Sequence, residues 1–171
     1  MQDVVKDLGF LTLGTRFKRI GELLQAQTQA LLAQGELHLP AAHFPLLAAL
    51  DRLGPLAVSE LSEAVGVSQP VVSRSLLGLQ AAGLVESEGL PGDRRVRQIR
   101  LSQQGQQLVQ GAKQQLWPAI EAAVAEACQA LQGPLLEQLA ALEAALAHKP
   151  LPQRAAEARS RSIKPARRRA A

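Results

Sequence analysis

The sequence predicts a mostly α-helical protein that carries one short β-hairpin, and three observations support this prediction. Apolar residues make up 47% of the 171-residue chain but aromatic residues only 2%, so the core must be built mainly from leucine and alanine, which are strong helix formers. Apolar side chains recur at helical spacing over most of the chain. Two short extended runs flank a segment rich in glycine and proline, which is typical of a hairpin.

The N-terminal part is predicted to contain a long helix followed by a short one. Across residues 4–34, apolar residues from Phe10 to Leu31 follow a 3-4-3-4-7 spacing, which places them in one stripe along a helix. Residues 41–53 form the short helix. We expect it to end at Gly54, because a glycine followed by a proline stops a helix.

Two further short helices are predicted to form a helix-turn-helix. Ser59 is positioned to cap the first of them, which closes at Gly66. Ser68 is positioned to cap the second, which runs to about Ala82. Because only three residues join the two helices, their arrangement is typical of a helix-turn-helix.

The outward, N-terminal half of the second helix carries side chains suited to DNA. An amide can donate and accept hydrogen bonds at a base edge, a guanidinium can bind guanine or phosphate, and hydroxyls can bind phosphates. An alternative interpretation is that Ser68 only caps the helix and Arg74 is only a solvated charge. We assign DNA contacts in this helix to Ser68, Gln69, Pro70, Ser73 and Arg74.

The expected hairpin, with strands at residues 84–88 and 96–101, concentrates positive charge. Its four arginines have only Asp93 as an adjacent carboxylate: Arg94, Arg95, Arg97 and Arg100. Because unpaired like charges repel one another, this cluster predicts a polyanionic partner, although a solvated charged turn is an alternative. We assign DNA contacts to Arg94, Arg95 and Arg97. Asp93 would pair with a neighbouring arginine and so keep the tip of the hairpin rigid.

The C-terminal part is predicted to hold two more helices and a basic tail. Ser102 caps a long helix that reaches residue 131, and Pro118 should kink it. A last helix starts at Gly133-Pro134. Residues 149–171 carry eight basic side chains and one acidic side chain, with too few large apolar residues to fold alone.

Several classes of protein are excluded by what the sequence lacks. The lone Cys128 rules out an intramolecular disulfide, and there is no glycine-rich phosphate loop, nucleophile elbow or metal-binding helix motif. We therefore expect no enzyme activity, no cofactor and no metal, although Glu36, His38 and His43 lie near one another in sequence. No signal peptide and no apolar stretch of 18 residues is present, so we expect a cytoplasmic protein without a membrane partner.

Taken together, these motifs resemble those of the multiple antibiotic resistance regulator (MarR) family, which are bacterial winged-helix transcription factors. The matching segments are Leu61–Gly66, Val67-Ser68-Gln69-Pro70, Val72-Ser73-Arg74, Leu79 with Gly83-Leu84-Val85, Asp93-Arg94-Arg95 and Leu101-Ser102-Gln103-Gln104-Gly105. They lie between about Phe44 and Gly105. The flanking helices agree with the family in length and order, so the resemblance covers roughly residues 5–148.

The resemblance implies one winged-helix domain over residues 1–148, with a two-stranded β wing and a DNA-binding lobe at about residues 55–101. The long helices of residues 4–34 and 102–148 would interlock with those of a second copy, giving a homodimer. The recognition helix, beginning at Ser68, would enter the major groove of double-stranded DNA.

The resemblance also implies roles for single residues outside the recognition helix. Asp93 and Arg95 correspond to the family's characteristic acid–arginine pair in the wing. Family members are often repressors that release DNA when a small molecule, commonly anionic or aromatic, binds between the dimer helices and the lobe. Arg16, Phe17 and His43 would line such a pocket.

The sequence thus predicts a sequence-specific DNA-binding transcriptional regulator. We expect a ligand-responsive repressor that acts as a homodimer on a pseudo-palindromic operator, at the nucleoid of a bacterial cell. Two alternatives stay open. One is a constitutive or architectural DNA-binding protein without small-molecule input. The other is an interaction module whose helices bind another protein and whose basic tail touches a membrane.

Overall fold

The computed structural model describes residues 2–34, 39–90, 93–155 and 157, with only the backbone at residues 34, 90 and 93–96. The chain divides into two units, Met1–Val124 and Ala125–Ala171, and each is described by itself. No helix in the described ranges is long and apolar enough to cross a membrane.

The first unit opens with three helical segments where one continuous helix is predicted. These are α1 (Val4–Asp7), the 3-10 turn η1 (Gly9–Thr12) and α2 (Leu13–Gln34). The prediction of an unbroken helix over residues 4–34 is wrong at Gly9. Its φ of +55° lies in the left-handed region, so the right-handed helix cannot pass through it.

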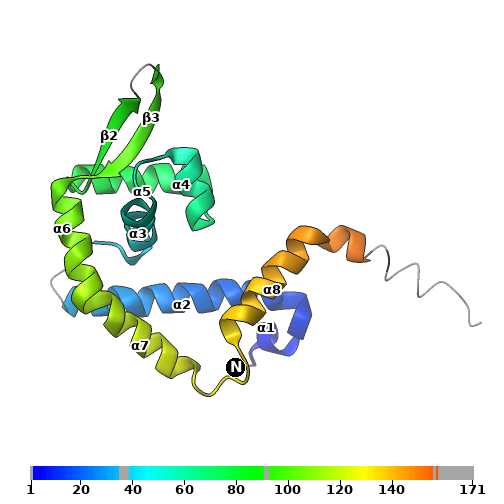
Figure 1. Ribbon diagram of the computed structural model, residues 1–171. Helices are drawn as coiled ribbons and strands as arrows, with labels where there is room; N and C mark the ends of the chain where they lie inside the picture. The colour runs from blue at the N-terminus through cyan, green and yellow to red at the C-terminus, as the bar shows by residue number, and fades with distance from the viewer. Residues whose placement is uncertain (1, 35–38, 91–92, 156, 158–171) are drawn as a thin grey trace, which may run out of the picture. The chain divides into compact units, whose positions relative to one another are not determined.

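The predicted helix-turn-helix and hairpin are both present, as α4 with α5 and as β2 with β3 (Figure 1). The elements in chain order are η2 (Ala41–His43), α3 (Phe44–Leu53), β1 (Leu56–Ala57), α4 (Val58–Val65), α5 (Gln69–Ala81), β2 (Val85–Leu90) and β3 (Asp93–Leu101). The sheet is antiparallel with strand order β1-β3-β2. The two-residue strand β1 is not predicted from the sequence, because it is too short to show an alternating pattern.

The core lies where α3, α4 and α5 meet the inner side of this sheet. Each helix contributes a side chain with no exposed surface, namely Leu47 from α3, Leu61 from α4, and Val72 and Leu79 from α5. Ile99 of β3 joins the same cluster at 4% exposure. The two helices of the helix-turn-helix are therefore fixed to the sheet by apolar contacts, and the hairpin of β2 and β3 extends away from them (Figure 1).

The long helix predicted after Ser102 is divided by a π-helical turn. It consists of α6 (Gln103–Gly111), η3 (Ala112–Leu116) and α7 (Trp117–Cys128). The turn lies immediately before Pro118, where a kink is predicted. A proline removes a backbone donor and crowds the preceding turn, and the wider π-turn accommodates this.

The second unit, which begins within α7, contains α8 (Leu135–His148). The start of α8 agrees with the prediction from Gly133-Pro134. Its last turn is capped by Arg154, whose guanidinium donates hydrogen bonds to the carbonyls of Ala145 and Lys149 at 2.5 and 2.7 Å.

Candidate nucleic-acid interface

The turn of the helix-turn-helix is closed by hydrogen bonds from both of its sides. Helix α4 ends at Gly66, whose φ of +67° is the left-handed conformation common at a helix C-terminus. The Ser62 hydroxyl donates to the carbonyl of Val67 at 2.5 Å, and the N–H of Val67 donates to the carbonyl of Ser62 at 3.3 Å. Ser62 was not predicted to have a role, because nothing in the sequence shows that the turn brings it back to Val67.

The N-terminal ends of both helices differ in detail from the prediction. Helix α4 is capped at Ala57, not at Ser59. The N–H of Ala57 donates to the carboxylate of Glu60 at 2.7 Å, which is the acidic half of a capping box, while Ser59 lies within the first turn of the helix. Ser68 does occupy the position before α5, but its side chain makes no capping hydrogen bond. Its hydroxyl is therefore not used by the helix.

Helix α5 has one buried face and one exposed face, as its sequence predicts. Val72, Leu76 and Leu79 are buried in the core. The five residues assigned to DNA contact are all exposed: Ser68, Gln69, Pro70, Ser73 and Arg74. The Arg74 Nε donates to the carbonyl of Pro70 at 3.3 Å, which directs the side chain along the N-terminal half of the helix. The structure thus brings these groups together on one solvent-facing surface.

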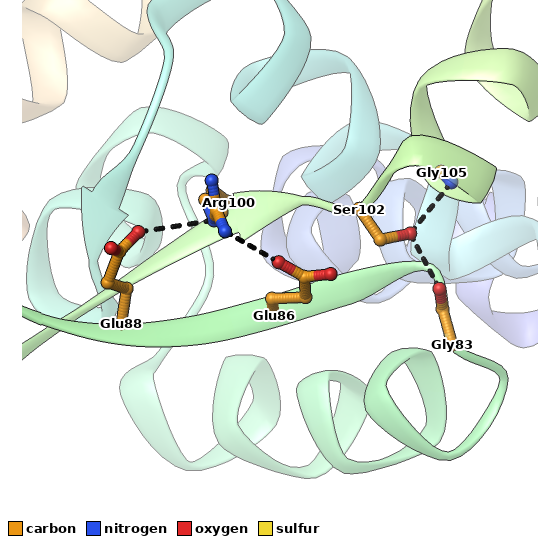
Figure 2. A network of polar contacts seen from close by, with 6 residues as sticks. All are labelled: Gly83, Glu86, Glu88, Arg100, Ser102 and Gly105. Atoms are coloured by element: carbon orange, nitrogen blue, oxygen red, sulfur yellow. Dashed lines mark hydrogen bonds and ion pairs between the residues drawn. The ribbon is translucent and has the colours of Figure 1, made fainter.

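The wing, defined here as β2 and β3, pairs its charges more fully than the sequence suggests. Arg100 faces Glu86 across the strands, and its Nη2 lies 2.9 Å from Glu86 Oε2 (Figure 2). Its Nε lies 3.3 Å from Glu88 Oε2. The expectation that Asp93 alone offsets the arginine cluster is therefore wrong, because the two carboxylates of the facing strand neutralise Arg100.

Arg97 lies on the other face of β3. It is exposed, it lies opposite Gly89, and it makes no ion pair with another described side chain. A guanidinium in this state remains available to a polyanion. The side chains of Asp93, Arg94 and Arg95, to which wing functions are assigned, lie outside the described residues.

The base of the wing is joined to α6 through Ser102. Its hydroxyl donates to the carbonyl of Gly83 at 2.6 Å and accepts from the N–H of Gly105 at 3.0 Å (Figure 2). This confirms that Ser102 caps the helix, and it adds a link across the wing that was not predicted. Gly105 leaves no room for a side chain, because a Cβ there would lie 2.0 Å from the carbonyl oxygen of Leu84.

This combination of an anchored α5, a tight turn and an adjacent wing agrees with a comparison against known families. The model of the MarR family matches residues 39–96, which is the segment from η2 to the wing. Over this segment the chain is similar to the MarR family.

Solved structures of transcriptional regulators, one of them described as a MarR-family protein, have the same fold. A transcriptional regulator of the MarR family from Silicibacter pomeroyi is 27% identical, with a TM-score of 0.59, and the match covers 88% of this chain and 98% of that one. CouR, a transcriptional repressor solved with a 23-mer DNA duplex, is 23% identical with a TM-score of 0.63. The match covers 82% of this chain and 96% of CouR. BpsR of Bordetella bronchiseptica is 21% identical with a TM-score of 0.59, and the match covers 80% of this chain and 92% of BpsR. Its structure concerns the regulation of DNA binding by 6-hydroxynicotinic acid.

The lobe that contains α4 and α5 also borders a cavity of about 480 Å³. Its walls come from α2, from the segment of η2 and α3, and from both helices of the helix-turn-helix. Val71, Val72 and Ser75 of α5 are among the lining residues, so an occupant would touch α5. Gln25, Thr28 and Ser75 are the polar residues of the lining, and none of the lining residues is charged.

The three residues assigned to a ligand pocket do not line this cavity. Arg16 and Phe17 lie on α2, the first half-buried and the second exposed. His43 lies at the end of η2, and its Nδ1 is buried without a hydrogen-bond partner among the described residues. Burial lowers the pKa of His43 from its ordinary value. An unpartnered buried polar atom costs about 1–3 kcal/mol of folding free energy. Apolar contacts of the ring must offset this cost, because no hydrogen bond of Nδ1 to another described residue does so.

Proposed function

We propose that this MarR-family protein is a sequence-specific regulator of transcription that binds double-stranded DNA. The observation that carries the proposal is the two-sided character of α5. Three apolar residues fix the helix to the core, while its opposite face carries an amide, hydroxyls and a guanidinium in solvent. Rigid placement of such groups is what base reading in a major groove requires.

The wing would add contacts beside the recognition helix. Arg97 would bind backbone phosphates or enter the adjacent minor groove, where the negative potential attracts guanidinium groups. We assign the same function to Arg94 and Arg95, with Asp93 as the residue that holds the tip. Arg100 is excluded from this set, because Glu86 and Glu88 already occupy its guanidinium.

We further propose that the regulator acts as a homodimer. In the N-terminal helices, several large apolar side chains face solvent, among them Phe10 at 93% and Leu11 at 81% exposure. Leu136 of α8 is 79% exposed. Large exposed apolar patches mark interaction sites. A two-fold dimer would place its recognition helices about 34–36 Å apart, in successive major grooves, so the operator would be a pseudo-palindrome.

The protein would be a repressor that a small ligand releases from DNA. The cavity supports this proposal because its walls include the recognition helix and α2, so that an occupant could favour one placement of the recognition helix over another. A ligand shifts such an equilibrium only by its difference in affinity for the two states, and a few kcal/mol is enough. Because no charged side chain lines the cavity, an uncharged aromatic ligand fits it better than an anion.

Selection from a library of random DNA duplexes with the full-length protein tests the proposal. We expect enrichment of an inverted repeat whose half-sites are about one helical turn apart. If each protomer neutralises about four phosphates, the log–log salt dependence of binding should have a slope on the order of −7. Equal binding to all duplexes would refute sequence-specific regulation and favour an architectural role. A protein that binds no duplex would refute the DNA-binding function itself.

The ligand response is tested on the selected duplex. Uncharged phenols and the matching aromatic acids would be screened for a rise in melting temperature, and each hit would then be added to the protein–DNA complex. We expect release of DNA by uncharged compounds. Compounds that stabilise the protein but leave its DNA affinity unchanged would contradict the proposed ligand response.

The regulator would act in the cytoplasm, at the nucleoid.

A further inference from the structure

The recognition helix contains one glycine, and His43 lies against it. A Cβ built on Gly78 would lie 3.2 Å from Cε1 of His43 and 3.9 Å from its Nε2. Apart from the nearby backbone of the helix and the two chain neighbours of Gly78, no other heavy atom of the described residues lies within 4 Å of that position. The imidazole of His43 therefore lies so close that a Cβ at position 78 would make a tight contact with it.

Both partners of this contact are unfavourable on their own. Glycine inside a helix is less stable than alanine, because its backbone loses more freedom on folding. His43 places a polar nitrogen in a buried site without a hydrogen bond. Local choices that oppose stability are expected mainly where function requires them. Here the two choices are related, since the absence of a Cβ at Gly78 lets the ring lie against α5 without a shift of either.

The contact also lies on the face of α5 that borders the cavity. Val71 and Ser75 line that cavity, and Gly78 follows them in the same row, three residues after Ser75. On the other element, Ala41 and Ala42 line the cavity and His43 comes next in the chain. The ring thus lies between the start of α3 and the C-terminal half of the recognition helix.

We propose that His43 is a positioning residue for DNA recognition, which sets the distance of α5 from the start of α3 by resting on Gly78. This proposal rests on the proposed function, because it assumes that α5 reads DNA. A side chain at position 78 would have to move either the ring or the helix by a few tenths of an ångström. Base contacts require accurate placement, so such a shift should reduce specific binding more than binding to random DNA.

A double-mutant cycle tests this proposal. We would compare the wild type, Gly78→Ala, His43→Ala and the double variant in the full-length chain. The two measurements are the affinity ratio between the selected duplex and a random duplex, and the melting temperature. His43→Gln, alone and with Gly78→Ala, provides a second background, because its flexible side chain can move away from a new methyl group. The matched control is Gly111→Ala, at a helical glycine whose Cβ would meet no atom within 4 Å.

We expect Gly78→Ala to lower the affinity ratio at least about fivefold, as when one bidentate base contact is disturbed. In either His43 variant background the same change should lower the ratio less than about twofold. The melting temperature should rise when Gly78→Ala is added to a His43 variant, as in the Gly111→Ala control, but not when it is added to the wild type. If Gly78→Ala only weakened the fold, it would lower the affinity ratio in every background. A smaller effect in the His43 variants therefore indicates that the methyl group acts through the ring.

The proposal is overturned if Gly78→Ala lowers the ratio equally in all backgrounds, or leaves it unchanged in all of them. It is also overturned if the melting temperature rises equally in all backgrounds, because the ring would then not touch the methyl group. If the wild type itself selects no duplex, the proposed function fails and the positioning role fails with it. If the wild type selects a duplex and the cycle is additive, only the role of His43 is refuted.

Discussion

Ser102 offers the most direct test of how the wing is attached to the rest of the lobe. Replacing it by alanine removes two hydrogen bonds, one that caps α6 through Gly105 and one that holds the carbonyl of Gly83. Loss of an N-cap hydroxyl costs about 1 kcal/mol. Loss of the second bond adds about 1 kcal/mol, because Ser102 is only 7% exposed and water cannot easily replace its hydroxyl.

We therefore expect Ser102→Ala to lower the free energy of unfolding by about 2 kcal/mol. For a chain of this length, that corresponds to a fall in melting temperature of roughly 4–8 °C. The free energy would be measured by urea unfolding followed by circular dichroism. Ser102→Thr keeps a hydroxyl and should retain most of the stability.

Ser68→Ala provides a matched control, because Ser68 also precedes a helix but makes no capping bond with its side chain. It should change the free energy of unfolding by less than about 0.5 kcal/mol. The reasoning is refuted if Ser102→Ala costs no more than this control. It is equally refuted if both serines prove equally important, because the hydrogen bonds would then not be the cause.

Three further predictions follow from single residues. Gly105→Ala should cost more than the roughly 1–3 kcal/mol usual for an added methyl group, because the new Cβ would meet the carbonyl oxygen of Leu84; a melting temperature equal to that of the wild type would contradict the crowding. Arg74→Ala should relax base preference at one operator position, by about 1–3 kcal/mol in competition binding; an equal loss at every position would instead indicate a phosphate contact. Burial lowers the pKa of His43 in the folded state, so the unfolded chain binds more protons at this residue as the pH falls. The contribution of His43 to the free energy of unfolding is therefore complete above about pH 6.5 and decreases at lower pH. Urea midpoints from about pH 7.5 to about pH 5.5 should therefore fall further for the wild type than for His43→Gln, and parallel curves would exclude this contribution.

The lobe could be predicted from the sequence because its signals are local. Gly66 and the cap position of Ser68 fix the turn of the helix-turn-helix within a few residues, and the spacing of Val72, Leu76 and Leu79 fixes the buried face of α5. Each of these signals depends on the backbone preference or periodicity of neighbouring residues. The structure therefore confirms the order of the helices and the presence of the hairpin.

What could not be predicted depends on pairing between distant residues. The charge of Arg100 is neutralised because the hairpin register places it opposite Glu86, and that register depends on the geometry of the turn as well as on the hydrophobic pattern. The contact between His43 and Gly78 joins residues far apart in sequence. The presence of a glycine inside α5 is therefore explained only once the chain is folded and the ring lies against it. The helix breaks at Gly9, one residue before the apolar stripe begins at Phe10, so the stripe carries no information about the break.

The π-turn of η3 determines the rotational phase of α7. The N–H of Trp117 donates to the carbonyl of Ala112, five residues earlier, so this turn holds one residue more than a regular α-helical turn. Each residue of an α-helix advances the rotation by about 100°. Deleting one residue between positions 112 and 117 would return the segment to regular geometry, and it would keep Trp117 against the hydrophobic cluster on which it packs, because four residues would then complete the turn that five complete now. In a regular α-helix the same deletion would rotate everything after it by about 100°, so the π-turn is where this helix best tolerates the loss of a residue.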